Sequence, residues 1–115
     1  ARTRRTFGQR LADHQVIRHK LVDMAERVET TRALLDDLAA RLAAGQAPVA
    51  QIAMAKNYAA RSMQFCADAA VQILGGTGFM RGTRVERIYR DVKVMMIGGG
   101  AEEVMKDLAA RQLGI

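Results

Sequence analysis

Apolar residues recur at helical spacing over two long stretches of the chain. In the first, from about residue 11 to residue 44, mostly apolar positions alternate four and three residues apart, at Ile17, Leu21, Met24, Val28, Thr31, Leu35, Leu38 and Leu42. This spacing is typical of a helix packed lengthwise on another helix. Gly45 is expected to end that helix, and Pro48 suits the first turn of the next one.

The second stretch, from about residue 48 to residue 74, has the same spacing but smaller side chains, at Ile52, Ala55, Ala59, Ser62, Cys66, Ala69 and Ile73. Small residues predict that a partner helix approaches closely. The stretch ends at the run 75–78, Gly-Gly-Thr-Gly, which a helix is not expected to cross.

Two shorter helices complete the pattern. The sequence Thr83-Arg84-Val85-Glu86 has the form of a capping box and predicts a helix start there. The glycines at 98–100 interrupt this helix, and a last one is expected from about Ala101 to Leu113. Strand signals are nearly absent, so the chain is predicted to be all-α, an antiparallel up-and-down helical bundle. The first ten residues are expected to form an arm or the tail of a helix that the chain lacks.

Composition narrows the class of protein. The 115 residues suit a single domain, half of them are hydrophobic and only 4% are aromatic, which predicts a core of aliphatic side chains and methionine. A single cysteine excludes a disulfide scaffold and a cysteine-rich zinc cluster. No apolar run approaches the roughly 18 residues of a membrane helix, and no signal-peptide pattern opens the chain. A soluble intracellular domain is therefore expected.

The formal net charge of +6 comes from two basic patches. Residues 1–20 carry six cationic side chains against Asp13 alone, and residues 81–93 carry five against two acidic ones. Such patches suit partners that bear phosphate, which include nucleic acids, nucleotides and coenzymes.

Several motifs have a functional and a structural interpretation. The stretch Arg4–Gly8 offers guanidinium groups, a hydroxyl and an aromatic ring to a phosphate-bearing ligand, but by itself favours a solvated basic N-terminus. The glycine run 75–78 can expose backbone N–H groups to a ligand, although a loop that ends a helix is the simpler interpretation. A basic stripe, more typical of a solvated or salt-bridged face than of a phosphate site, lies at Arg81, Arg84, Arg87, Arg90 and Lys93.

The remaining reactive side chains favour structural roles. No cysteine or carboxylate stands at metal-ligand spacing from His14 or His19, so no metal site is predicted. Glu102 and Glu103 suit the positive end of the last helix. Cys66 lies among small residues and is interpreted as buried packing.

Taken in order, four stretches resemble the C-terminal helical domain of the acyl-CoA dehydrogenase family: RRTFGQRLADHQ at 4–15, AMAKNYAA at 53–60, QILGGTGF at 72–79, and YRDVKVMMIGGGAEEVMKDLAAR at 89–111. The resemblance implies a flavoenzyme that removes hydrogens from the α and β carbons of an acyl-CoA thioester. In that family a glutamate takes the α proton, FAD accepts the β hydride, and an electron-transferring flavoprotein takes the electrons. The family fold joins an N-terminal helical domain, a middle β domain and a C-terminal bundle, usually in a tetramer.

The resemblance also assigns cofactor-binding positions. The segment that meets the diphosphate and adenosine side of FAD, with the helix positions beside it, matches Arg4, Arg5, Thr6, Phe7, His14 and Gln15. The turn that approaches the FAD of a neighbouring subunit matches Gln72, Ile73, Leu74, Gly75 and Gly76. Ala101 and Glu103 match flavin-contacting positions, and Gly100 matches a substrate-binding one.

The loop before the last helix departs from part of the family. Short- and medium-chain members read Tyr-Glu-Gly-Thr there, and that glutamate is the catalytic base. The matching positions here are Gly98, Gly99, Gly100 and Ala101, so Gly99 stands at the alternative base position and no catalytic residue is assigned within the chain. The glycine form resembles the long-chain and isovaleryl branches, whose base lies on an earlier helix, expected before residue 1.

The resemblance implies that residues 1–115 are a single C-terminal domain, a fragment of a larger multidomain flavoenzyme that lacks its first helix and is inactive alone. FAD, acyl-CoA, an electron-transferring flavoprotein and further copies of the chain are the expected partners, without nucleic acid or a membrane span, in the bacterial cytoplasm or the mitochondrial matrix. The seams at 17–42 and 52–73 are expected to be partly exposed and hidden by oligomer contacts. A basic helical nucleic-acid-binding module and a purely structural helical dimerisation domain stay open as alternatives.

Overall fold

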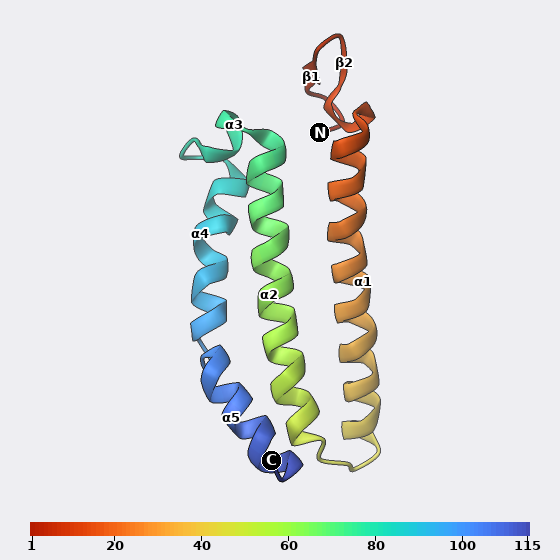
Figure 1. Cartoon of the computed structure of the whole chain (residues 1–115), viewed down its shortest axis with the longest axis vertical. Helices are drawn as coiled ribbons and strands as arrows, with labels where there is room; N and C mark the ends of the chain where they lie inside the picture. Colours follow the sequence, from red (N-terminus) through yellow and green to blue (C-terminus); the bar gives the residue numbers. More distant parts are fainter.

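Three helical columns lie side by side, with α2 in the middle, in the computed structural model, which describes all residues 1–115 (Figure 1). The bundle is elongated, 56 × 25 × 24 Å. One outer column is α1, and α4 followed by α5 forms the other. The elements are β1 (Arg5–Thr6), β2 (Gln9–Arg10), a 3₁₀ turn (Leu11–Asp13), α1 (Gln15–Ala43), α2 (Val49–Leu74), α3 (Gly76–Phe79), α4 (Arg84–Ile97) and α5 (Glu102–Leu113).

The all-α, up-and-down architecture and its four main helices are confirmed. Gly45 lies just after the C-cap of α1, where the predicted helix end is found, with φ +77°, a conformation that glycine adopts without steric cost. Thr83 caps α4, because its Oγ1 accepts a hydrogen bond from the Glu86 N–H at 3.3 Å. None of the helices is both long enough and apolar enough to cross a membrane.

The central helix α2 is buried through small side chains. Ala53 and Ala55 are each only 2% exposed, and the other buried alanines of this helix are Ala50, Ala60, Ala67 and Ala69. At one end, Ala50 and Ala53 form a cluster with Ala109 of α5. The prediction that small residues let neighbouring helices approach closely is therefore confirmed.

The two predicted seams differ in exposure. On α1, every seventh residue is open to solvent: Leu21, Val28, Leu35 and Leu42 are 37–51% exposed. On α2 the seam is only partly exposed: Ile52 is 39% exposed, whereas Ala55, Ser62, Ala69 and Ile73 are buried. The difference arises because α2 is covered on both sides, whereas α1 has only α2 as a long neighbour.

Helix α2 ends at Leu74, as the glycine run predicts, and the run itself contains one separate helical turn, α3. Gly75 breaks the path with φ +57° and ψ −142°. Gly78 then lies against α2: a Cβ added to it would stand 2.8 Å from the Val71 carbonyl oxygen and 3.1 Å from the Val71 Cα. This glycine is needed for close packing of α3 on α2.

Residues 5–10 form a β-hairpin, so the first ten residues are not the tail of a helix. Arg5 pairs with Arg10 and Thr6 with Gln9. The two-residue turn between them has Phe7 at φ +49° and Gly8 at φ +81°, as a type I′ turn requires. Helix α1 begins at Gln15 rather than near residue 11, because the chain leaves this hairpin through the 3₁₀ turn.

Candidate functional site

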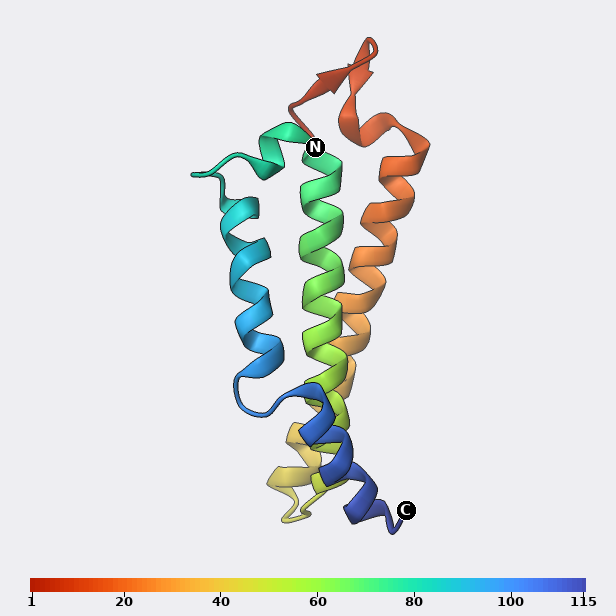
Figure 2. The same ribbon diagram turned by 60° about the vertical axis from the view of Figure 1, so that its left-hand side comes forward.

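Arg4 joins the hairpin to the turn that follows α2. Its Nη1 donates to the Leu74 carbonyl oxygen and to Thr77 Oγ1, the latter at 3.2 Å. These partners lie about seventy residues further along the chain. The hairpin and the glycine-rich turn therefore meet at one end of the bundle (Figures 1 and 2).

The hairpin presents an arginine and a phenylalanine to solvent. Arg5 Nη2 donates to the Gly8 carbonyl oxygen at 2.8 Å, which is the one hydrogen bond of that guanidinium group. Phe7 is 97% exposed and holds a positive φ that non-glycine residues seldom adopt. An exposed bulky side chain held at a positive φ is typical of a ligand-contacting position.

His14 holds the hairpin in place through hydrogen bonds to both of its strands. Gln9 Nε2 lies 2.9 Å from His14 Nδ1, while His14 Nε2 lies 3.1 Å from Thr6 Oγ1 and 3.2 Å from the Thr6 carbonyl oxygen. The arrangement assigns the proton to Nε2, which donates to Thr6 as Nδ1 accepts from the Gln9 amide. The Phe7 ring stands edge-on to the imidazole, with centroids 6.3 Å apart.

A bidentate ion pair stabilises the 3₁₀ turn. The Arg10 guanidinium donates through Nε and Nη2 to the two Asp13 carboxylate oxygens, each at 2.8 Å. These hydrogen bonds hold the pKa of Asp13 below its usual range. The ion pair therefore ties the end of the hairpin to the 3₁₀ turn.

The structure divides the residues assigned from the resemblance into two groups. The first lies at the hairpin end and comprises Arg4, Arg5, Thr6, Phe7, His14, Gln15, Gln72, Ile73, Leu74, Gly75 and Gly76. Within it Ile73 is buried in the core, so its side chain does not reach the surface, whereas Gln15, Gln72, Gly75 and Gly76 are exposed. The amides of Gly76 and Thr77 donate to no backbone carbonyl.

The second group lies on the loop between α4 and α5. It is separated from the first by the 14 residues of α4, about 21 Å of helix. Gly99 and Gly100 have φ of +70° and +111°, and Ala101 is the N-cap of α5 without a side-chain cap. Glu103 is exposed in the first turn of α5.

Glu102 is engaged in ion pairs and is therefore poorly suited to act as a base. Its Oε1 lies 2.8 Å from Lys106 Nζ and 3.7 Å from Arg61 Nη1. The hydrogen bond from Lys106 is the main cause that lowers the pKa of Glu102. The predicted role at the positive end of α5 fits this position.

Sequence reasoning missed two polar residues of α2 that hold this loop. Lys56 Nζ donates to the Met96 carbonyl oxygen at 3.2 Å and to the Gly100 carbonyl oxygen. Asn57 is 4% exposed, and its Nδ2 donates to the Glu102 carbonyl oxygen at 2.9 Å. The sequence signal that could have identified them is the polar pair Lys56-Asn57 in the middle of an alanine-rich helix, where apolar residues are expected.

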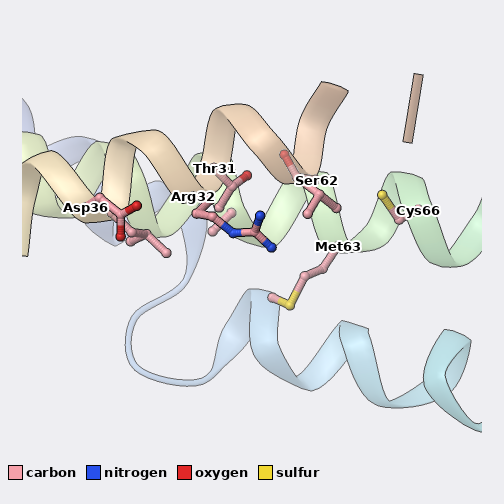
Figure 3. Close-up of a pocket in the computed structure, with 9 residues that line it drawn as sticks. Thr31, Arg32, Asp36, Ser62, Met63 and Cys66 are labelled. Carbon is pink, nitrogen blue, oxygen red and sulfur yellow. The ribbon is translucent and has the colours of Figure 1, made fainter. Parts of the chain in front are cut away.

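A groove of about 460 Å³ runs between α1 and α2 (Figure 3). It is lined mostly by the exposed face of α1 and by small residues of α2: Val28, Thr31, Arg32, Leu35, Asp36, Ala59, Ser62, Met63 and Cys66. Burial raises the pKa of the Cys66 thiol. Cys66 is only half-buried and lines the groove, so the predicted buried packing is met only in part. The buried Ser62 hydroxyl has no hydrogen-bond partner.

The basic stripe of α4 is partly neutralised. Arg90 Nε forms an ion pair with Glu86 Oε1, and this contact holds the pKa of Glu86 below its usual range. The prediction of a salt-bridged face is therefore confirmed for this pair.

Almost the whole chain is similar to a region of known proteins. Residues 1–114 match the model for the family described as acyl-CoA dehydrogenase, C-terminal domain. The chain belongs to the acyl-CoA dehydrogenase family. It is 36% identical over 114 residues to cyclohexane-1-carbonyl-CoA dehydrogenase of Geobacter metallireducens, covering 98% of this chain and 30% of that enzyme.

Solved structures share the fold. An acyl-CoA dehydrogenase from Geobacillus kaustophilus superimposes with a TM-score of 0.94 at 32% identity, covering 99% of this chain and 30% of that one. The FAD complex of PigA gives a TM-score of 0.90 at 26% identity, with the same two coverages. The chain thus spans about 30% of the length of the relatives it matches.

Proposed function

We propose that this chain is the FAD-contacting and subunit-assembling C-terminal domain of an acyl-CoA dehydrogenase. One observation carries the proposal: Arg4 brings together two separate family motifs, the segment 4–8 and the turn 72–78, at a single end of the bundle. A packing role alone accounts for Arg4, but leaves the exposed Arg5 and Phe7 without a purpose.

The residues at this end fit a dinucleotide cofactor. The unused N–H groups of Arg5 suit a diphosphate, because a guanidinium fork matches phosphate oxygens. Phe7 offers an exposed aromatic face, and Gly76 and Thr77 offer backbone amides without an acceptor. Bound FAD would supply the hydride acceptor, while these residues bind and orient its diphosphate and adenosine side.

The loop 98–101 would form part of the flavin and substrate side of the site. Ala101 and Glu103 are the proposed flavin contacts and Gly100 the proposed substrate contact. Gly99 carries no proton-accepting group, and a Cβ there would meet no atom within 4 Å. The catalytic glutamate is therefore proposed to come from an earlier helix of a longer protein, as in the long-chain and isovaleryl branches of the family.

Subunit assembly is proposed to use the open face of α1. Leu21, Val28, Leu35 and Leu42 repeat every seven residues beside the groove of Figure 3. Apolar surface of this extent is seldom left open to water. A second copy of the chain is the proposed occupant, and light scattering that gives a monomer at both low and high concentration would count against it.

The test of this function uses a full-length protein, which contains residues 1–115 and has the length of the relatives. We expect it to purify with a flavin absorption band that bleaches when an acyl-CoA is added without oxygen and returns with an electron-transferring flavoprotein. A series of straight and branched acyl-CoA thioesters identifies the substrate, for which the Gly99 loop favours long or branched chains. Protein that takes up no flavin and oxidises none of the series would refute the proposal.

A further inference from the structure

The α4–α5 loop is held from α2 by a lysine. Helix α4 ends at Ile97, so most carbonyl groups of its last turn have no intrahelical partner. Lys56 Nζ donates both to the Met96 carbonyl oxygen in that turn and to the Gly100 carbonyl oxygen in the loop. A cation at this place also favours the negative end of the α4 dipole.

No carboxylate competes for this ammonium group. The nearest acidic residue in the network, Glu102, pairs with Lys106 and Arg61, and no oxygen of a carboxylate lies within 4.0 Å of Lys56. The half-buried Lys56 therefore directs its charge at backbone carbonyl groups. Both of its hydrogen bonds are made to the backbone, although its charge also contributes to the lowered pKa of Glu102.

The loop has few other restraints between its ends. The Gly98 N–H donates to the Val94 carbonyl oxygen at 2.7 Å, and the Met105 N–H donates to the Ala101 carbonyl oxygen at 3.0 Å. The amides of Gly99, Gly100 and Ala101 donate to no backbone acceptor. Glycines with positive φ at 99 and 100 allow many conformations, so a contact at the Gly100 carbonyl selects one of them.

We propose that Lys56 is a positioning residue, which holds residues 98–101 in the conformation that the flavin and substrate side of the site requires. The purpose of this conformation rests on the function proposed above, whereas the restraint itself rests on the contacts of Lys56. Asn57, which donates to the Glu102 carbonyl oxygen, fixes the far end of the same connection. Residues of α2 therefore hold the loop at both of its ends, Lys56 at Met96 and Gly100 and Asn57 at Glu102.

The test compares Lys56→Met with Lys56→Arg in the full-length protein. Methionine keeps the apolar stem and removes the donors, whereas arginine keeps the charge and the donors. Lys93→Met is the matched control, since Lys93 is exposed and takes part in no hydrogen bond or ion pair. The first readout is amide hydrogen exchange in peptides that span residues 95–106, which contain the protected amides of Gly98 and Met105.

We expect Lys56→Met to speed exchange in this segment by about tenfold or more, because it removes two charge-assisted hydrogen bonds. Exchange in the rest of α2 and in α1 should stay unchanged. The second readout is steady-state kinetics, in which kcat should fall by about ten- to a hundredfold with little change in KM, as misplaced groups cause. Lys56→Arg should restore both readouts, and Lys93→Met should alter neither.

Unchanged exchange in Lys56→Met, an equal increase throughout the domain, or no rescue by arginine would overturn the positioning role. If Lys56→Met does not fold, Lys56→Gln takes its place, and equal exchange in the glutamine and arginine variants would overturn the role. Failure of the proposed function is a separate result: the unsubstituted protein would then hold no flavin, while the exchange measurement would still report on Lys56.

Discussion

Gly78 provides a sharp test of why the turn after α2 is rich in glycine. A methyl group at this position would lie 2.8 Å from the Val71 carbonyl oxygen and 3.0 Å from Leu74 Cβ. The first of these atoms belongs to the α2 backbone and cannot rotate away, so α3 must move off α2. Overpacking of this kind costs about 1–3 kcal/mol.

Gly76 is the matched control in the same helical turn. Its φ is not positive, and a Cβ there would meet no atom within 4 Å. Both substitutions to alanine bring the same gain in helix propensity, so their difference isolates the steric cost at Gly78. The free energy of unfolding of Gly78→Ala should therefore be about 1–3 kcal/mol lower than that of Gly76→Ala.

Urea unfolding followed by circular dichroism measures this difference, and thermal unfolding gives an independent value. At about 4 °C per kcal/mol for a domain of this size, the two melting temperatures should differ by about 4–12 °C. If Gly78→Ala proves as stable as Gly76→Ala, α3 does not pack on α2 as described. The glycine would then need another explanation, such as access for a ligand.

Three further predictions concern single features. Ala101→Ser should raise the free energy of unfolding by about 1 kcal/mol in urea titrations, because α5 lacks a side-chain N-cap; no gain would mean that the loop cannot take the capping geometry. Ser62→Ala should stabilise the 115-residue chain by about 1 kcal/mol, because the buried hydroxyl has no partner; a loss would show that the groove is covered by a group that binds it. The pKa values of Asp13, Glu86 and Glu102 are lowered in the folded state, which therefore binds fewer protons than the unfolded state in acid. The free energy of unfolding should fall as the pH drops below about 4.5. Arg90→Met and Lys106→Met remove partners of these carboxylates and should make this fall shallower in acid titrations.

The sequence predicted the helical elements well because their signals are local. The four-and-three spacing, the glycines at helix ends and the capping residue Thr83 each act within a few residues. The exposure of the seams was predicted less well. Which face of α1 stays open depends on how many neighbours surround it, and spacing along one helix carries no information on that.

The candidate site was predictable only as a set of motifs. The resemblance supplied the hairpin and the turn as separate segments, but not the Arg4 hydrogen bonds that join them. The hairpin itself was missed, since four strand residues around a turn give too short a pattern for alternation. Lys56 and Asn57 were missed as well, because their partners are backbone carbonyl groups about forty residues away.

The central claim is that the hairpin end of this domain holds the diphosphate of FAD. Its most direct test is a titration of the full-length apoprotein with FAD, comparing Arg5→Gln with Arg2→Gln, an exposed arginine three residues before the hairpin. We predict that Arg5→Gln weakens FAD binding by about ten- to a hundredfold, as the loss of charge-assisted hydrogen bonds implies, and that Arg2→Gln binds as the unsubstituted protein does. Equal affinity of all three proteins for FAD would contradict the claim.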